Sequence, residues 1–245
     1  MIIMIWNTRG TGGASFRRLL GDIVARDGVN FFGLFEPRQI GMKANLIARK
    51  LGWTHMHVVE VQGFSGGIWL FWDSTLNFSV ISSGNQFIHS IVNKGKSDEW
   101  SLTVVYGHPD MINRHRLWPI LEGIQQLVIR GWVVIGDFNV ISCPQERWSK
   151  NHRDNSGIDR LFRNWLLGSE LLEIGFNGPQ FTWGNSTSHI KIDRALVDKC
   201  WFTKYHNATV THLPKFKYDH CPVLVNTNSH VFSEKKRRPF RFFAP

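Results

Sequence analysis

The chain has 245 residues, with 29 Lys or Arg against 19 Asp or Glu, for a formal net charge of +10. Hydrophobic residues make up 42 %, which is enough for a folded core and excludes global disorder. No apolar run approaches the roughly 20 residues that a membrane-spanning helix needs. The positive charge favours a polyanionic partner, either a nucleic acid or an anionic membrane surface.

The first half of the chain alternates short apolar runs with two amphipathic segments. Helical spacing predicts helices at 17–24 and 44–51. Apolar runs bounded by Gly, Pro and polar residues predict strands at 2–6, 31–35, 55–61, 67–72, 77–82, 86–92 and 101–106. The strands at 55–61 and 67–72 are expected to form an antiparallel pair across a turn at 63–66.

The second half continues this pattern with longer helices. An apolar stripe predicts one helix over 114–129, and a second helix is expected at 158–167. Strands are predicted at 132–135, 181–183, 191–197, 208–213 and 222–225. Strands often follow one another directly, which favours an α/β (α+β) fold of two mostly antiparallel sheets packed face to face, with helices outside, over a parallel Rossmann sheet.

The three cysteines, Cys143, Cys200 and Cys221, are odd in number and far apart in sequence. This argues against a disulfide framework, a disulfide-linked partner or a structural zinc site, and predicts a reducing intracellular location. We expect one domain over 1–228 and a basic C-terminal tail over 229–245. The tail is either a solvated terminus or a segment for phosphate contact or nuclear import.

Polar side chains recur where predicted strands end. Each has an ordinary explanation on its own, since Asp and Asn favour turns and a single Glu is usually solvated. Together, carboxylates and amides along one rim of a sheet suit a hard divalent cation and a group that orients or deprotonates water. The residues are Asn7, Glu36, Tyr106, Asp137, Asn139, Asp193, Asp219 and His220.

In this order the motifs resemble the endonuclease/exonuclease/phosphatase superfamily, which includes DNase I-like nucleases and abasic-site endonucleases. The likeness covers about residues 1–225 and rests on six motifs in sequence. They are Trp6-Asn7-Thr8-Arg9-Gly10, Phe35-Glu36-Pro37-Arg38, Val105-Tyr106-Gly107-His108-Pro109, Gly136-Asp137-Phe138-Asn139, the run 192–197 and Asp219-His220-Cys221-Pro222.

Within that superfamily the sequence is most similar to the endonucleases of plant LINE-type retrotransposons. Phe181-Thr182-Trp183, the run 193–197 and the run 238–242 carry this likeness. A reverse transcriptase follows the endonuclease in those elements, whereas this chain stops at Pro245. The expectation is a lone or truncated retrotransposon-derived module that acts on DNA in the nucleus.

The resemblance implies a four-layer α/β sandwich and a divalent-metal phosphodiesterase. It implies that Glu36 is the principal Mg²⁺ ligand, helped by Asn7 and Asp219, and that Mn²⁺ can substitute. Asp137 is expected to position or deprotonate the attacking water.

The same resemblance implies roles for the remaining motif residues. Asn139 and Tyr106 are expected to hydrogen-bond the scissile phosphate, and His220 to stabilise transition-state charge, with its ring oriented by Asp193. Four basic residues beside the motifs are candidates for phosphate or DNA contacts or, equally, solvated surface groups: Arg9, His108, Lys215 and Lys217.

Two positions depart from the family's pattern. Arg9 stands where an Asp or another polar residue is common, and Tyr218 stands where a Ser usually precedes the Asp-His pair. In an extended segment, side chains two residues apart point to the same face. This predicts that the Tyr218 ring lies beside His220, where it crowds the phosphate or, alternatively, stacks on an unpaired base or sugar.

The leading hypothesis is a Mg²⁺-dependent DNA endonuclease that nicks one strand. Two alternatives remain open at this stage. One is a phosphomonoesterase of phosphoinositides or nucleotides, because one fold can host several activities. The other is a catalytically inactive remnant that binds nucleic acid.

Overall fold

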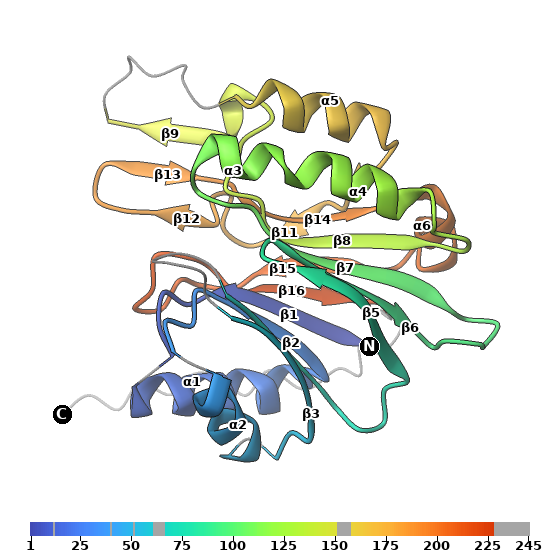
Figure 1. Cartoon of the computed structure of the whole chain (residues 1–245). Helices are drawn as coiled ribbons and strands as arrows, with labels where there is room; N and C mark the ends of the chain where they lie inside the picture. Colours follow the sequence, from blue (N-terminus) through green and yellow to red (C-terminus); the bar gives the residue numbers. More distant parts are fainter. Residues whose placement is uncertain (12, 40, 51, 61–66, 151–157, 228–245) are drawn as a thin grey trace.

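A computed structural model of the chain describes residues 1–11, 13–39, 41–50, 52–60, 67–150 and 158–227 (Figure 1). Two large sheets lie face to face at its centre. The predicted turn at 63–66 and the predicted tail at 229–245 fall outside the described residues. No helix in the described part is long and apolar enough to cross a membrane. The three cysteines carry free thiols.

The first sheet has seven strands in the order β11-β15-β16-β1-β2-β4-β3. Two neighbouring pairs, β1 with β2 and β11 with β15, are parallel, and the others are antiparallel. The predicted pair of β3 and β4 is confirmed. The strands are β1 (Ile2–Asn7), β2 (Phe31–Phe35), β3 (His55–Val59), β4 (Ile68–Trp72), β11 (Phe176–Asn177), β15 (Thr209–His212) and β16 (Val223–Asn226).

The second sheet has six strands in the order β10-β14-β8-β7-β6-β5. Only β7 and β8 pair in parallel within it. Its strands are β5 (Phe78–Gly84), β6 (Phe87–Val92), β7 (Trp100–Tyr106), β8 (Trp132–Asp137), β10 (Leu172–Glu173) and β14 (Asp193–Val197). A small third sheet joins β12 (Trp183–Gly184), β13 (Ser188–Ile190) and β9 (Arg147–Ser149), in that order.

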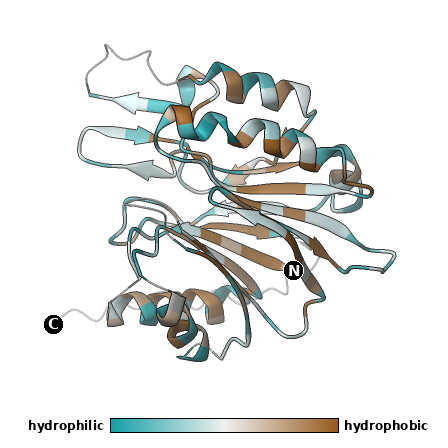
Figure 2. Cartoon of the chain, in the orientation of Figure 1, coloured by the Kyte–Doolittle hydropathy of each residue, from teal (hydrophilic) through white to brown (hydrophobic). Residues whose placement is uncertain are grey.

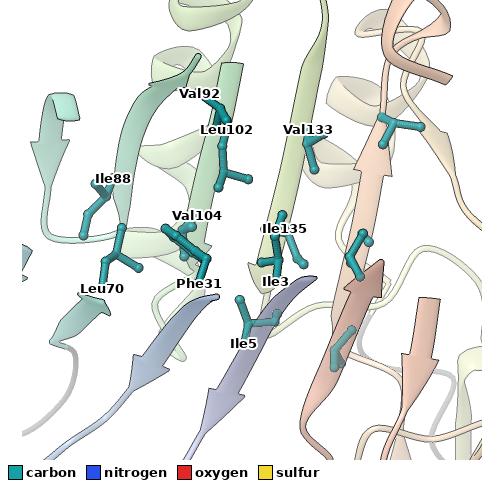
Figure 3. Packing of buried hydrophobic residues seen from close by; sticks show 14 of the residues in the cluster. Ile3, Ile5, Phe31, Leu70, Ile88, Val92, Leu102, Val104, Val133 and Ile135 are labelled. Carbon is teal, nitrogen blue, oxygen red and sulfur yellow. The ribbon is translucent and has the colours of Figure 1, made fainter. Parts of the chain in front are cut away.

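The main core fills the space between the two large sheets. Side chains alternate along each strand, so every second residue faces inward. In β1 these are Ile3 and Ile5, which pack toward Val104 of β7 and Ile135 of β8 (Figure 3). The intervening residues, such as Met4, face the helices on the outer side of the same sheet.

The helices complete the predicted four layers. α1 (Ala14–Asp27) and α2 (Gly41–Lys50) cover the outer face of the seven-stranded sheet, and α4 (Leu117–Gln125) and α5 (Arg160–Gly168) cover that of the six-stranded sheet (Figure 1). α3 (Met111–His115) precedes α4, α6 (Lys199–Lys204) follows β14, and a 3₁₀ turn spans Pro144–Glu146. Hydrophobic residues run along the central strands, whereas the helices carry both kinds (Figure 2). The predicted sandwich is therefore confirmed.

One predicted helix, 114–129, is wrong in its extent. The chain forms α3 and α4 there, with Arg116 between them. Pro119 accounts for the break, because a proline ring in a continuous helix would clash with the carbonyl of the residue four positions earlier, His115. Leu127, expected on the apolar stripe, lies beyond the end of α4 and is exposed.

Candidate active site

Polar residues end the inward-facing rows of four central strands. Asn7 continues the row of Ile3 and Ile5 in β1, and Asp137 continues that of Val133 and Ile135 in β8. By the same alternation Tyr106 ends the inner row of β7, and Asp193 begins that of β14. The site therefore lies at one end of the core between the sheets, and Asn7, Tyr106, Asp137 and Asp193 are all buried.

Strand register brings Asp193 beside Asp137. The two residues are direct partners across the antiparallel pair of β14 and β8, and Tyr106 is the partner of Asp137 on the other side. Gly136 permits this close pairing, because a Cβ at that position would lie 1.8 Å from the Val105 carbonyl oxygen of β7. The glycine of the Gly-Asp-Phe-Asn motif therefore has a steric reason.

His220 completes a buried trio with the two aspartates. Its Nδ1 lies 3.0 Å from Asp193 Oδ2 and 3.9 Å from Asp137 Oδ2. The side chains are almost fully buried, with exposed fractions of 1 % for His220 and Asp193 and 0 % for Asp137. The predicted orienting contact between Asp193 and His220 is present.

Burial and charge shift the pKa values of this trio. Burial, reinforced by the neighbouring carboxylate of Asp193, raises the pKa of Asp137 to about 7. Burial alone would lower the pKa of His220, but the charge and hydrogen bond of Asp193 outweigh it and raise the pKa to about 9. At neutral pH the ring is therefore cationic, and a protonated imidazole cannot ligate a metal ion.

Asn7 links this trio to Glu36. Its Nδ2 donates hydrogen bonds to Glu36 Oε1 at 3.0 Å and to Asp137 Oδ2 at 2.9 Å. Tyr106 also donates to Glu36 Oε1, at 3.0 Å, and burial raises its pKa, so the phenol stays protonated. Glu36 follows β2 with a left-handed φ of 48°, an uncommon conformation that aims its carboxylate toward Asn7.

Two donors hold the carboxylate of Asp219. Arg9 Nη1 contacts its Oδ2 at 2.6 Å, and Trp183 Nε1 donates to the same oxygen at 3.0 Å. The Arg9 guanidinium also approaches Glu36 Oε2, with Nε at 3.9 Å, and Arg38 Nη2 lies 3.6 Å from that oxygen. Arg9 thus stands between the two carboxylates that the sequence predicts as metal ligands.

Two residues of this network were missed by sequence reasoning as site residues. Arg38 lies within the Phe35-Glu36-Pro37-Arg38 motif and Trp183 within the run 181–183. Their places in these motifs could have identified both as residues near the site. Trp183 reaches Asp219 because it forms an isolated bridge with His220, which places β12 along the site.

Asn139 is held at the site by its backbone and its amide. Its backbone N–H donates to Asp137 Oδ1 at 2.9 Å, and its Nδ2 donates to the Gly107 carbonyl at 2.8 Å. The first contact orients the Asp137 carboxylate, and the second ties the loop after β8 to the end of β7.

The other predicted phosphate contacts lie farther along the same loops. His108 follows β7 and accepts a hydrogen bond from the Asp110 backbone N–H at Nδ1, 3.0 Å away. Lys215 and Lys217 lie in the turn before Asp219, where Lys217 is exposed and Lys215 partly buried. Their contact with nucleic acid stays a prediction.

The predicted position of Tyr218 beside the phosphate is wrong. A turn at 215–218, closed by the Tyr218 N–H to the Lys215 carbonyl at 2.9 Å, leads into a bend at 218–219, so the segment is not extended and its alternation does not apply. The ring packs edge-on against Trp6 at 4.6 Å and near Phe16 at 6.1 Å. Tyr218 therefore belongs to the outer core under α1, where it cannot crowd the site.

The donor set fits a hard divalent cation. Glu36 and Asp219 offer carboxylate oxygens, and the Asn7 amide offers Oδ1, which accepts the Arg9 backbone N–H at 3.2 Å. Such all-oxygen sets suit Mg²⁺ or Mn²⁺. Among the described residues, Asp137, Asp193 and His220 also form an acidic cluster with ligand atoms within 4.8 Å of one another. The buried Asp193 Oδ1 receives no hydrogen bond there.

Comparison with solved structures finds many similar folds. NExo from Neisseria, a 3′ phosphatase solved with a product DNA hairpin, superposes with a TM-score of 0.71 at 16 % identity, over 93 % of this chain and 99 % of that one. An AP endonuclease from Archaeoglobus fulgidus superposes with a TM-score of 0.68 at 13 % identity, over 92 % of this chain and 98 % of that one.

A retrotransposon enzyme is also among the similar structures. The endonuclease domain of TRAS1, a telomere-specific non-LTR retrotransposon, gives a TM-score of 0.63 at 12 % identity, over 92 % of this chain and 97 % of that domain. At such identities these likenesses establish the shared fold. A search of curated proteins finds no match.

The sequence itself matches a family model over residues 4–210, which spans most of the chain and includes Asn7, Glu36, Tyr106, Asp137, Asn139 and Asp193. This match agrees with the sandwich of two sheets and with the placement of Asn7, Glu36, Tyr106, Asp137 and Asp193 at one end of it. The chain belongs to the Endonuclease/Exonuclease/phosphatase family.

Proposed function

We propose that this protein is a divalent-metal-dependent endonuclease that nicks one strand of DNA. The observation that carries the proposal is the meeting of two groups at one end of the core. The Glu36 and Asp219 carboxylates form an oxygen donor set, and the hydrogen-bonded Asp193–His220 pair lies beside Asp137. Phosphodiester hydrolysis needs both a centre of positive charge and a proton acceptor.

Each buried side chain has a role in this proposal. Asp137, with a pKa of about 7, is the group that accepts the proton of the attacking water. His220 is cationic and donates to a phosphate oxygen, which stabilises the charge of the transition state. Asp193 keeps the ring charged and oriented through the 3.0 Å contact.

Neutral donors complete the site. The second N–H of the Asn139 amide hydrogen-bonds the scissile phosphate, and so does the Tyr106 hydroxyl once its O–H turns away from Glu36 Oε1. Glu36, Asp219 and Asn7 would hold the cation, Mg²⁺ or Mn²⁺. The cation would act as a Lewis acid and polarise the phosphate. Arg9, Lys215 and Lys217 add positive charge for the nucleic-acid backbone, and His108 is a further candidate for a phosphate contact.

Three observations favour DNA as the substrate. The net charge of +10 suits a polyanion. One structural neighbour is a 3′ phosphatase solved with a DNA hairpin, and another is a retrotransposon endonuclease domain. We also propose, from the sequence motifs, that the chain is a module derived from a plant LINE-type retrotransposon and acts in the nucleus.

Nicking of supercoiled plasmid tests the proposal. We expect conversion to the open-circular form with Mg²⁺ or Mn²⁺ and none with EDTA. Phosphate release from nucleotide or phosphoinositide monoesters, without nicking, would favour a phosphomonoesterase instead. A salt-sensitive gel shift without cleavage under either condition would identify an inactive nucleic-acid-binding protein.

A further inference from the structure

Arg9 occupies the space between the two outer carboxylates of the site. Its Nη1 lies 2.6 Å from Asp219 Oδ2, and its Nε lies 3.9 Å from Glu36 Oε2. The guanidinium therefore contacts both carboxylates assigned above to the cation. Its own backbone is bent into this position, with a left-handed φ of 42° and its N–H bonded to Asn7 Oδ1.

The two carboxylates need a counter-charge when no cation is bound. Glu36 and Asp219 are mostly covered, with side chains 13 % and 25 % exposed, whereas the Arg9 side chain is 44 % exposed. Burying like charges together without a partner is unfavourable. A long, half-exposed arginine can supply the missing charge and can also move away, because its stem is flexible and faces solvent on one side.

We propose that Arg9 is a built-in counter-ion that competes with the divalent cation for Asp219 and Glu36. A cation held by these carboxylates would replace the contact of Nη1 with Asp219, and the released guanidinium would be free to meet a phosphate. This inference rests on the proposed metal site. It predicts that the chain binds divalent cations more weakly than its oxygen donors alone would allow.

Arg38 has a smaller part in the same competition. It lies 3.6 Å from Glu36 Oε2, but its side chain is 59 % exposed, and its charge is therefore better screened by water. Removing Arg38 should affect cation binding less than removing Arg9. This ranking distinguishes competition for the site from a general effect of net charge.

The test is Mn²⁺ binding to the full chain without DNA, measured by isothermal titration calorimetry and by electron paramagnetic resonance of the free ion. Arg9→Met keeps the length and removes the charge. We expect about fivefold tighter binding, because the wild type must first give up the ion pair of Arg9 with Asp219, whose strength at a half-exposed position corresponds to about that factor. Arg38→Met should gain about two- to threefold.

Arg130→Met is the matched control. Arg130 is exposed and precedes β8, while Asp137 ends that strand, so its charge lies roughly 20 Å from the site. We expect its Mn²⁺ affinity to equal that of the wild type. Arg9→Gln provides a second uncharged variant should the Met variant fold poorly, with circular dichroism as the check of folding.

Glu36→Gln separates this inference from the metal site on which it rests. Loss of Mn²⁺ binding in Glu36→Gln, together with tighter binding in both uncharged Arg9 variants, supports the inference. Loss in Glu36→Gln with unchanged or weaker binding in the Arg9 variants overturns the competition and keeps the metal site. Wild-type binding in Glu36→Gln removes the metal site, and the competition with it.

Discussion

Replacement of Asp193 by Asn removes the charge that keeps His220 protonated, while the size and shape of the side chain are retained. His220 has a pKa of about 9 in the folded protein, above its ordinary value of 6.5. Burial lowers this pKa, and Asp137 and Asp219 raise it more weakly than Asp193. In Asp193→Asn we therefore expect a pKa for His220 near or below about 6.5.

The expected loss of activity follows from the protonated fraction of His220. With a pKa of about 9 the ring is almost fully charged at pH 7.5. With a pKa near 6.5 only about a tenth remains charged at that pH. Nicking by Asp193→Asn at pH 7.5 should therefore fall roughly tenfold through protonation alone, and further through lost orientation of the ring. The protonation deficit should nearly vanish by about pH 5.5.

Two measurements check this reasoning. An NMR titration of the His220 ring gives its pKa directly in both proteins, and nicking rates from pH 5.5 to 9 give the ratio of the two activities. A deficit that is constant across pH would show that Asp193 only positions the ring. A His220 pKa that is unchanged in Asp193→Asn would refute the electrostatic argument.

Three further variants test other parts of the structure. Glu36→Gln should lower plasmid nicking by about 100-fold or more at limiting Mg²⁺, and an undiminished rate would exclude Glu36 as a ligand. Tyr218→Ser should leave nicking unchanged but lower the unfolding free energy by about 2 kcal/mol, through lost packing against Trp6; a gain in nicking would restore the crowding hypothesis. Burial would raise the pKa of Glu146, but the hydrogen bond and charge of Arg194 outweigh it and lower the pKa to about 2. The ionised carboxylate therefore stabilises the fold above about pH 4.5, and this stabilisation is lost as the pH falls toward 2. Glu146→Gln should cost about 3 kcal/mol in urea unfolding at pH 7, with a flatter acid limb; equal stability at pH 7 would contradict this.

Most residues of the site can be predicted from the sequence, because polar residues that follow short apolar runs mark the ends of buried strands. Asn7, Asp137 and Asp193 each mark the end of an inward-facing row, and the structure places them together. Their partners depend on register. That Asp193 pairs with Asp137 follows from the alignment of β14 with β8, which periodicity within one strand does not specify.

Local chain geometry accounts for the predictions that were wrong. The Tyr218 prediction assumed an extended strand, but a turn at 215–218 directs the ring to the outer core. The helix over 114–129 ignored Pro119, whose effect on the carbonyl of His115 was readable from the sequence. Strands of two or three residues, such as β10 and β13, are too short for alternation to be recognised.

The contacts of Arg9 could not be predicted from the sequence, for a different reason. From the sequence, Arg9 is a departure from the family's pattern two residues after Asn7 and a candidate for phosphate contact. The ion pair with Asp219 joins two segments more than 200 residues apart, and no local pattern encodes such a pair. Long-range ion pairs of this kind require the fold.

Plasmid nicking by Glu36→Gln and its matched control tests the central claim most directly. Glu122→Gln makes the same chemical change on the exposed face of α4. We expect Mg²⁺-dependent nicking by the wild type and by Glu122→Gln and no nicking by Glu36→Gln. In EDTA we expect no nicking by any of the three proteins. Nicking that persists in EDTA, or that Glu36→Gln retains at the wild-type rate, would contradict a metal-dependent endonuclease centred on Glu36.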